Sequence, residues 1–339
     1  MSTDTPMGAA DTRAQARALS AAAAMAGHAP SIHNTQPWRW RLTGNELNLR
    51  LDHSRALDVT DRDSRLAILS CGAALHHALV GLAADGWHTD VARMPDPAYP
   101  DHLARLSLDR RIPVSLEARR HRQTIGLRHT DRRPTAAAPV DADNLYAVVA
   151  AAESAGTGLH LLHPDQVYGL ARDADQAQRA ENEDIAWQAE LAYWTGGSRP
   201  LGSGIPDAAI PDHTTRATVP DRDFGHHGDL PVTGAPGNAA TFAILYGPAD
   251  DEANWLRTGE ALSAAWLTAT ELGLSVLPLS ATIEVTVTRE RIRLLLAGLG
   301  HPHLVLRISA GDPAGSAAAR APRLAAAQVI ERGWNGRHT

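Results

Sequence analysis

The sequence predicts an α+β protein built from two copies of one unit. Residues 71–87 match residues 258–274 without a gap, and each stretch is helical with a glycine near its start and another at its end. A closing glycine readily adopts the left-handed backbone that ends many helices. An alanine-rich helix and a strand precede each stretch, and strands follow it. The alternative is a chance similarity between alanine-rich amphipathic helices.

Composition narrows the class of protein. The chain has 339 residues and a mass of 36.1 kDa, which is long enough for two domain-sized units. Its hydrophobic content of 44% and charged content of 21% are typical of a soluble globular protein. A net charge of −6 gives no basic footprint, so we expect no nucleic-acid partner. The single cysteine, Cys71, excludes an intrachain disulfide and fits a reducing compartment.

Neither a signal sequence nor a membrane span is expected. Residues 1–13 are polar and have no apolar core. No run approaches the roughly 18 uncharged apolar residues that a membrane-spanning helix needs. We therefore expect a cytoplasmic protein without a membrane partner.

The first unit is expected to span residues 12–124. A glycine-containing turn at residues 43–45 lies between two alternating apolar stretches and predicts a hairpin. The expected elements are helices at 12–25, 66–84 and 115–127, and strands at 38–42, 46–51, 91–94 and 103–108.

The second unit is expected to span residues 125–330. Residues 195–237 within it are rich in glycine and proline, have no clear period, and are far longer than an ordinary connection. Such a stretch is either a functional cover or disordered. The other expected elements are helices at 140–153, 164–194, 254–272 and 288–296, and strands at 159–162, 241–246, 274–279 and 304–309.

A polar loop at residues 29–38 separates the first helix from the first strand. Its two prolines fix φ and stiffen it. Ser31, Asn34 and Gln36 then present hydrogen-bond donors and acceptors that suit a planar, heteroatom-rich ligand. The alternative is a capped turn that covers a buried tryptophan, because these residue types also gather in turns for structural reasons.

The second unit lacks this loop and has a cluster that the first unit lacks. Residues 154–158 hold only Ser-Ala-Gly-Thr-Gly at the position of the loop. The cluster Arg-His-Thr-Asp-Arg at residues 128–132 precedes the first helix of the second unit, where the first unit has only Thr12 and Arg13. A ligand that needs both elements is therefore bound once, across the two halves.

These motifs resemble those of the FMN-dependent nitroreductase superfamily, specifically its Acg-type branch. Ordinary members are dimers in which each FMN site takes an Arg-x-Ser/Thr cluster from one subunit and a Pro-Ser-x-x-Asn-x-Gln-Pro-Trp loop from the other. The resemblance covers most of residues 12–330. It implies a nitroreductase-like fold duplicated within one chain, with antiparallel-rich sheets wrapped by helices, one FMN in the seam, and a monomeric protein.

The resemblance also assigns site residues. It implies that the flavin phosphate is bound by Arg128, His129 and Thr130, and that a guanidinium and a hydroxyl there would cradle its oxygens. Arg323 matches a C-terminal basic residue that reaches the phosphate, with Arg320 and Arg307 as further candidates. Arg132 either assists this cluster or forms a solvated salt bridge.

The flavin ring and ribityl chain would contact a second group of residues. The matching positions in the polar loop are Pro30, Ser31, Ile32 and Asn34. Leu279 and Ser280 lie where the family places a segment beside flavin N5, although many relatives carry Glu-Gly at the positions of Ser280 and Ala281.

The implied activity is hydride transfer from NAD(P)H through FMN to a nitroaromatic or quinone. Since the flavin carries the chemistry, no catalytic acid or base and no metal are expected. Neighbouring histidines such as His76 and His77 point about 100° apart on a helix and chelate poorly. One alternative is a protein that sequesters FMN under a lid formed by residues 195–237, with little or no reductase activity. Another is a degenerate fold without a ligand.

Overall fold

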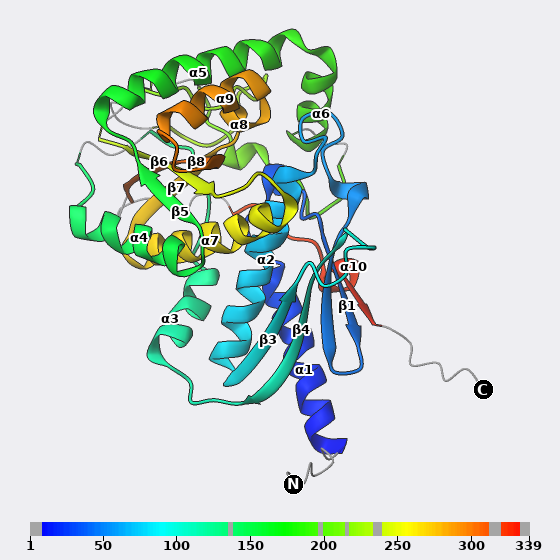
Figure 1. Cartoon of the computed structure of the whole chain (residues 1–339). Helices are drawn as coiled ribbons and strands as arrows, with labels where there is room; N and C mark the ends of the chain where they lie inside the picture. The colour runs from blue at the N-terminus through cyan, green and yellow to red at the C-terminus, as the bar shows by residue number, and fades with distance from the viewer. Residues whose placement is uncertain are drawn as a thin grey trace.

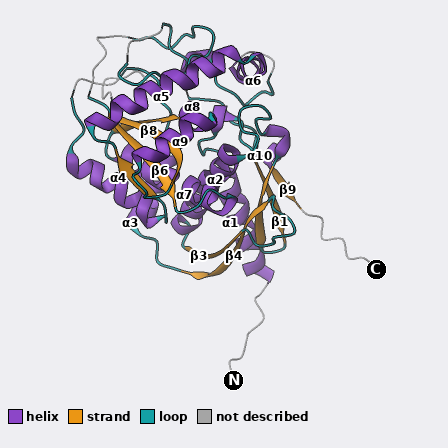
Figure 2. Ribbon diagram, turned by 45° about the horizontal axis from the view of Figure 1, so that its top comes forward, coloured by secondary structure: helices purple, strands orange, loops and turns teal. Residues whose placement is uncertain are grey.

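The computed structural model describes residues 9–134, 138–195, 199–213, 217–232, 239–311 and 320–332. The chain forms two sheets that lie on opposite sides of a central helical layer (Figures 1 and 2). Among these residues, every pairing within the sheets is antiparallel except that between β1 and β9. The expected α+β class with antiparallel-rich sheets is confirmed.

The first half contains a five-stranded sheet of order β3-β4-β2-β1-β9. Its last strand comes from the C-terminal end of the chain. The elements are α1 (Ala9–Ala26), η1 (Ile32–Asn34), β1 (Trp38–Thr43), β2 (Glu46–Leu51), η2 (His53–Arg55), α2 (Arg65–Ala84), β3 (Trp87–Arg93), β4 (His102–Arg111), α3 (Leu116–Ile125), α10 (Ala326–Val329) and β9 (Ile330–Arg332).

The second half contains a four-stranded sheet of order β5-β6-β8-β7. This order matches β1-β2-β4-β3 strand by strand, as the expected duplication would produce. The elements are α4 (Ala142–Ser154), β5 (Gly158–Leu161), α5 (Pro164–Glu183), α6 (Ile185–Thr195), η3 (Asp207–Ala209), β6 (Thr241–Gly247), α7 (Glu252–Glu271), β7 (Leu274–Leu279), α8 (Ala281–Glu284), α9 (Thr286–Leu295) and β8 (His301–Ala310).

Helix α2 contributes to the cores of both halves. Its Ala74 and Leu75 belong to the apolar cluster under the first sheet, and its Leu66 and Leu69 belong to the cluster under the second sheet. A helix that is apolar all round is normally buried on more than one side. Our expectation of no long apolar run was wrong here. Within the described residues α2 is long and apolar enough to cross a membrane, but 83% of its most apolar window is buried inside the protein.

Two glycines allow α2 and α7 to touch through their backbones. A Cβ atom on Gly72 would lie 2.0 Å from the carbonyl oxygen of Leu256, and one on Gly259 would lie 1.8 Å from that of Leu69. The contact is reciprocal, since each glycine meets the residue three positions before the other. Reciprocal contacts arise when equivalent surfaces meet across a two-fold axis. Gly72 and Gly259 are also equivalent in the sequence match.

The expected helix at residues 164–194 is two helices. Asp184 separates α5 from α6 and has an extended backbone, with φ −97° and ψ 107°. Its carboxylate accepts the N–H groups of Ala186 and Trp187. Asp184 therefore ends α5 and caps the start of α6. The sequence did not reveal this boundary, because the helical apolar spacing continues across it.

The C-terminal end adds a strand that the sequence did not predict. β9 pairs in parallel with β1, from Trp40–Ile330 to Leu42–Arg332. Leu324 and Val329 are buried in the core of the first half. A three-residue strand is too short to show alternation, and its partner lies almost 300 positions away, so neither periodicity nor local turn chemistry reveals it.

The alanine variant Gly259→Ala should lower the free energy of unfolding by about 3 kcal/mol, because a well-packed backbone contact leaves no space for Cβ. Gly169→Ala is the matched control. Gly169 is also helical, but a Cβ atom on it would lie 3.5 Å from Leu295 Cδ2, at ordinary contact distance. Urea denaturation of both variants measures the difference, and equal stabilities would contradict the backbone contact between α2 and α7.

Candidate functional site

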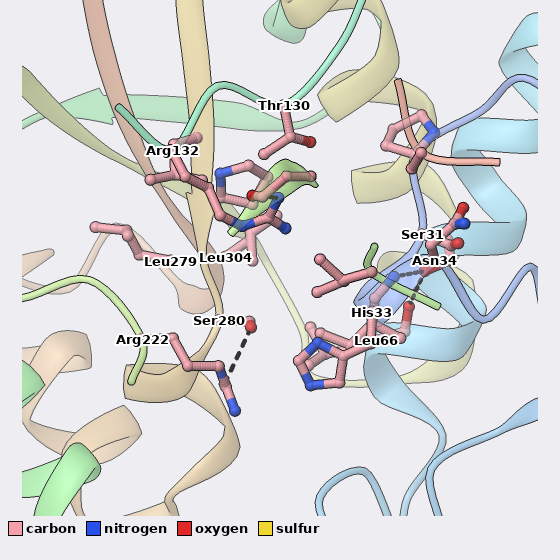
Figure 3. A pocket seen from close by; sticks show the side chains of 18 of the residues that line it. Ser31, His33, Asn34, Leu66, Thr130, Arg132, Arg222, Leu279, Ser280 and Leu304 are labelled. Carbon is pink, nitrogen blue, oxygen red and sulfur yellow. Dashed lines mark hydrogen bonds between the residues drawn. The ribbon is translucent and has the colours of Figure 1, made fainter. Parts of the chain in front are cut away.

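A cavity of about 240 Å³ lies between the two halves. Figure 3 shows Ser31, His33, Asn34 and Leu66 on one side of its open space, and Arg132, Arg222, Leu279, Ser280 and Leu304 on the other. Ten of the residues that the resemblance assigned to the flavin line this cavity: Pro30, Ser31, Ile32, Asn34, Arg128, His129, Thr130, Leu279, Ser280 and Arg323. Chain segments far apart in sequence therefore meet at one place.

The polar loop has an unusual backbone that is fixed to α2. His33, Asn34 and Gln36 have φ values of 43°, 56° and 53°, a left-handed region that residues other than glycine and asparagine rarely adopt. The N–H of Ile32 donates to Ser70 Oγ at 3.1 Å. The N–H of Gln36 donates to Ser31 Oγ at 3.0 Å. Hydrogen bonds of this kind offset the cost of the strained backbone.

The side chain of Asn34 joins three parts of the chain. Its Nδ2 donates to the carbonyl oxygens of Gly204 at 3.0 Å and Pro322 at 2.9 Å. Its Oδ1 accepts from Arg323 Nη1 at 2.7 Å. The amide is thus fully engaged by protein groups. Asn34 lines the cavity, but its polar atoms position Arg323 and do not point freely at a ligand.

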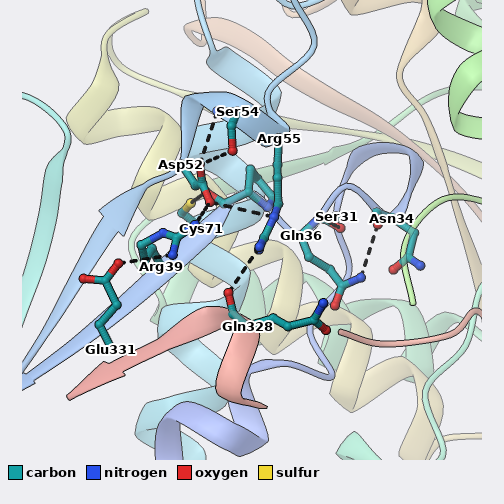
Figure 4. Close-up of polar contacts among 11 residues, drawn as sticks. Ser31, Asn34, Gln36, Arg39, Asp52, Ser54, Arg55, Cys71, Gln328 and Glu331 are labelled. Atoms are coloured by element: carbon teal, nitrogen blue, oxygen red, sulfur yellow. Dashed lines mark hydrogen bonds and ion pairs between the residues drawn. The ribbon is translucent and has the colours of Figure 1, made fainter. Parts of the chain in front are cut away.

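Gln36 lies beside Asn34, and its Nε2 donates to the carbonyl oxygen of Asn34 at 3.3 Å (Figure 4). Its Nε2 donates to the carbonyl oxygen of Gly202 at 2.8 Å, and its Oε1 accepts from the N–H of Leu324 at 3.0 Å. We call the described residues 199–213 and 217–232 the cover segment, and residues 320–332 the C-terminal segment. The polar loop therefore holds both the cover segment and the C-terminal segment.

The C-terminal segment is also anchored farther along. Glu331 lies 3.1 Å from Arg39 Nη1, and Arg55 Nη2 donates to the carbonyl oxygen of Gln328 at 3.2 Å (Figure 4). These contacts and β9 fix the direction in which the segment leaves the cavity, and hence the position of Arg323.

Arg128 is a buried cation with unused donors. Its residue is 6% exposed, and its Nε and Nη1 have no hydrogen-bond partner within the described part of the chain. Its Nη2 donates to the carbonyl oxygen of His28 at 3.3 Å, and its guanidinium lies 4.6 Å from the centroid of the Trp266 ring. Burial and the nearby charges of Arg323 and Arg320 lower the pKa of Arg128 to about 9. At neutral pH the guanidinium is still charged.

Arg323 approaches Arg128 closely. Its Nη2 donates to the same carbonyl oxygen of His28 at 3.3 Å, and its Nε has no partner in the same described ranges. Burial lowers its pKa to about 10. The described residues supply no acidic partner for either guanidinium. Buried charges are normally paired, so this end of the cavity has the electrostatics of an anion site.

The cover segment is fixed by buried ion pairs at the other end of the cavity. Arg222 Nη2 donates to Glu284 at 2.6 Å and lies 3.4 Å from Ser280 Oγ. Arg222 Nη1 lies 3.3 Å from Glu181 Oε2, although without hydrogen-bond geometry. Burial raises the pKa of Glu181 to about 7, opposed by Arg222 and reinforced by Glu284. Arg222 thus connects the cover segment to α5 and α8.

Curated relatives from Mycobacterium tuberculosis match almost the whole chain. A protein named "Putative NAD(P)H nitroreductase Rv3131" is 34% identical over 314 residues, which cover 91% of this chain and 89% of the relative. "Putative NAD(P)H nitroreductase acg" is 32% identical over 307 residues, covering 88% and 90%. The chain belongs to the Acg-type branch of the nitroreductase family. The resemblance drawn from the motifs is thereby confirmed.

Other comparisons add less about this nitroreductase-family protein. No protein-family model matches the chain. The FMN-dependent nitroreductase NfnB from Mycobacterium smegmatis, solved in complex with NADPH, is 13% identical with a TM-score of 0.38 and covers 66% of this chain and 99% of its own. A likeness of that size has no bearing on the ligand of this chain.

The environments of Arg307 and Arg132 differ from those that the sequence analysis offered for them. Arg307 does not line the cavity, because it binds Asp221 at 2.8 Å and the carbonyl oxygen of Arg133 at 2.9 Å. Arg132 is not a solvated salt-bridge partner, because its guanidinium is buried. It lines the cavity, donates to the carbonyl oxygen of Ala209 at 3.2 Å and lies 5.4 Å from the Phe224 ring centroid. Arg320 does line the cavity.

The sequence missed several residues of the cavity wall. Leu66 and Leu69 on α2 and Leu262 and Trp266 on α7 lie on the matched helices, so their apolar spacing was a signal that we read only as core. The cavity-wall residues of the cover segment follow no sequence pattern that would have singled them out individually. They are Ile205, Ala209, Pro220, Asp221, Arg222 and Phe224. Among the described residues, no group of three or more His, Cys, Asp or Glu side chains is arranged to hold a metal ion.

The raised pKa of Glu181 predicts a pH-dependent stability. Because the folded protein binds this proton more tightly than the unfolded chain, the stability contribution is fully present below pH 4.5 and is lost as pH rises through about 7. The variant Glu181→Gln should therefore lose less stability than the wild type when pH is raised from about 5 to about 8.

Urea denaturation at the two pH values measures this difference. Glu183→Gln is the control, since Glu183 is exposed on the same helix. Equal pH dependence in the wild type and Glu181→Gln would show that Glu181 is ionised at low cost in the folded protein.

Proposed function

We propose that the chain is an FMN-binding, nitroreductase-type oxidoreductase. The observation that carries this proposal is the buried guanidinium of Arg128, whose Nε and Nη1 are unpaired at the wall of the cavity among the residues that the structure describes. A buried charged donor without a partner is expensive unless a ligand supplies one. The names of the two relatives, both of which begin with "Putative NAD(P)H nitroreductase", support the same class.

The residues of the cavity fit FMN at both ends. Arg128, Arg323 and Arg320 would hold the phosphate, and Thr130 lines the same cavity. The wall beyond them is apolar and suits a planar ring system, being formed by Leu66, Leu69, Leu262, Trp266, Leu277 and Leu304. Pro30, Ser31 and Ile32 would approach the cofactor from the first half, and Leu279 and Ser280 from the second. His129 also lines the cavity, although its Nδ1 faces the carbonyl oxygen of Leu127 at 3.0 Å.

Bound FMN would supply hydride transfer from NAD(P)H to a nitroaromatic or quinone acceptor. The chain's own residues bind the phosphate, orient the ring and exclude water. Asn34 acts indirectly in this scheme, because its amide holds Arg323 and the cover segment in place. No side chain needs to exchange a proton for this role.

We also propose that the site is composite and the protein monomeric. In this proposal residues 12–124 form the first unit and residues 125–330 the second, although Leu324, α10 and β9 near the C-terminal end pack on the first unit. The matched strand orders and the reciprocal contact of Gly72 and Gly259 support a duplication. The polar loop comes from one unit and Arg128 from the other, so a single chain supplies both sides of the cavity and needs no second subunit.

Removing the Arg128 guanidinium should weaken FMN binding about 10- to 100-fold, because a charge-assisted hydrogen bond contributes about 1.5–3 kcal/mol. Titration of FMN into apoprotein, followed by flavin fluorescence, measures this for Arg128→Leu. Arg119→Leu is the control, since Arg119 is exposed on α3. A wild-type protein that shows no flavin band and takes up no FMN would overturn the proposed function.

A second candidate function is FMN storage without turnover. The observation that favours it is the cover segment, which lines the cavity and is held by the buried pair Arg222–Glu284 and by the polar loop. A segment fixed in this way would exclude nicotinamide and bulky acceptors. The two candidates differ in whether NADH or NADPH can reach the cavity.

Anaerobic mixing of the FMN-loaded protein with NADH or NADPH separates them. We expect rapid bleaching of the flavin in the wild type if the protein is a reductase. Absence of bleaching, together with its appearance in the double variant Arg222→Gln/Glu284→Gln, would establish storage instead. Replacing both partners leaves neither Arg222 nor Glu284 as an unpaired buried charge. Arg122→Gln/Asp85→Asn removes a more exposed ion pair away from the cavity as the control.

A further inference from the structure

His33 has an environment that the proposed function leaves unexplained. Its backbone is left-handed, with φ 43° and ψ 23°, and the residue is only 7% exposed. A bulky residue in this conformation costs roughly 1–2 kcal/mol. Such strain commonly accompanies a functional constraint. The imidazole lines the cavity.

The imidazole has no hydrogen-bond partner among the described residues. Its Nε2 is fully buried and makes no hydrogen bond to these residues. Its Nδ1 makes none to them either. Burial, followed by the charges of Arg222 and Arg132, lowers the pKa of His33 well below 6.5, so the ring is neutral. A neutral imidazole carries one N–H donor and one acceptor nitrogen. Both are unused, and a buried unpaired polar group requires an explanation.

The other polar side chains of the loop are occupied differently. Asn34 and Gln36 are engaged by protein carbonyl and N–H groups, and Ser31 accepts from the N–H of Gln36. Thr35 Oγ1 is also buried and has no partner among the described residues, but Thr35 does not line the cavity. His33 therefore combines an unused polar side chain with a place on the cavity wall.

The opposite wall shows which ligand would suit His33. In Figure 3 the open space separates His33 and Leu66 from Ser280 and Arg222. Arg222 and Arg132 are the charged groups that act on the imidazole, and Glu284 pairs with Arg222. A neutral N–H donor beside guanidinium groups favours ligand oxygens and disfavours ligand cations. Nitro and quinone oxygens have this character.

We propose that His33 determines acceptor specificity by donating a hydrogen bond to an oxygen of a planar nitro or quinone compound held between His33 and Ser280. This inference rests on the proposed function, since it assumes a cavity that already contains FMN. It adds a recognition role for a position that the family motif leaves open. His33 stays neutral and moves no proton in this role.

The test measures binding without turnover. FMN-loaded protein is titrated with 4-nitrobenzamide in the absence of any reductant, and the perturbation of the oxidised flavin spectrum gives the dissociation constant. His33→Leu should weaken binding about tenfold, because one hydrogen bond to a buried group is lost. Benzamide, which lacks the nitro group, should bind the wild type and His33→Leu equally.

Two conservative variants locate the nitrogen responsible. The amide of His33→Asn lies near the position of Nδ1, and asparagine tolerates the left-handed backbone. The amide of His33→Gln lies near the position of Nε2. One of them should restore most of the affinity for 4-nitrobenzamide. His160→Leu is the matched control, because the buried Nε2 of His160 also lacks a partner in the part of the chain that the structure describes, and His160 does not line the cavity.

Separate readouts distinguish the possible failures. The dissociation constant for FMN and the melting temperature are measured for every variant. Unchanged nitro-ligand affinity in a folded, FMN-loaded His33→Leu protein would overturn the specificity role alone. Loss of FMN affinity in the same variant would also overturn it, since His33 would then hold the cofactor. Failure of the wild type to bind FMN would overturn both the proposed function and this inference.

Discussion

The arrangement of the whole molecule depends on the backbone contact between α2 and α7. Gly72 and Gly259 remove the side chains that would otherwise keep the helices apart. Their close approach sets the separation of the two sheets and brings Leu69 and Leu262 to the floor of the same cavity. A wider crossing would separate the polar loop from Arg128, since these elements belong to different halves. Core packing and site geometry therefore have the same origin.

Much of the fold could be predicted from the sequence, and the failures have physical reasons. Long helices and the hairpin were readable because apolar spacing and turn residues are local signals. The break at Asp184 was hidden because a capping residue leaves the helical period almost intact. β9 was missed because pairing between Trp40 and Ile330 is set by tertiary contacts. The apolar run in α2 was misjudged because it faces two cores rather than one.

The candidate site was predictable where a motif carried it and unpredictable elsewhere. The polar loop and the cluster around Arg128 do line one cavity, as their complementary loss in the two halves indicated. Arg222 could not be found, because its partners Glu181 and Glu284 come from distant helices and the cover segment has no period. His33 occupies an unspecified position of the motif, and only its burial and its lack of a partner among the described residues distinguish it.

The contacts of Asn34 and Gln36 have an evolutionary consequence. Both side chains fasten the cover segment and the C-terminal segment to the first half, so a descendant that bound no ligand in the cavity would still need them to keep these segments in place. Selection for stability alone would preserve the Asn-x-Gln pattern. Among the described residues Arg128 makes one hydrogen bond, to the carbonyl oxygen of His28, and lies over the Trp266 ring. These contacts hold no other segment in place, so drift would replace Arg128 sooner in a protein without an anionic ligand. Among related chains, this arginine is thus a better marker of a working cofactor site than the loop by which the family is recognised.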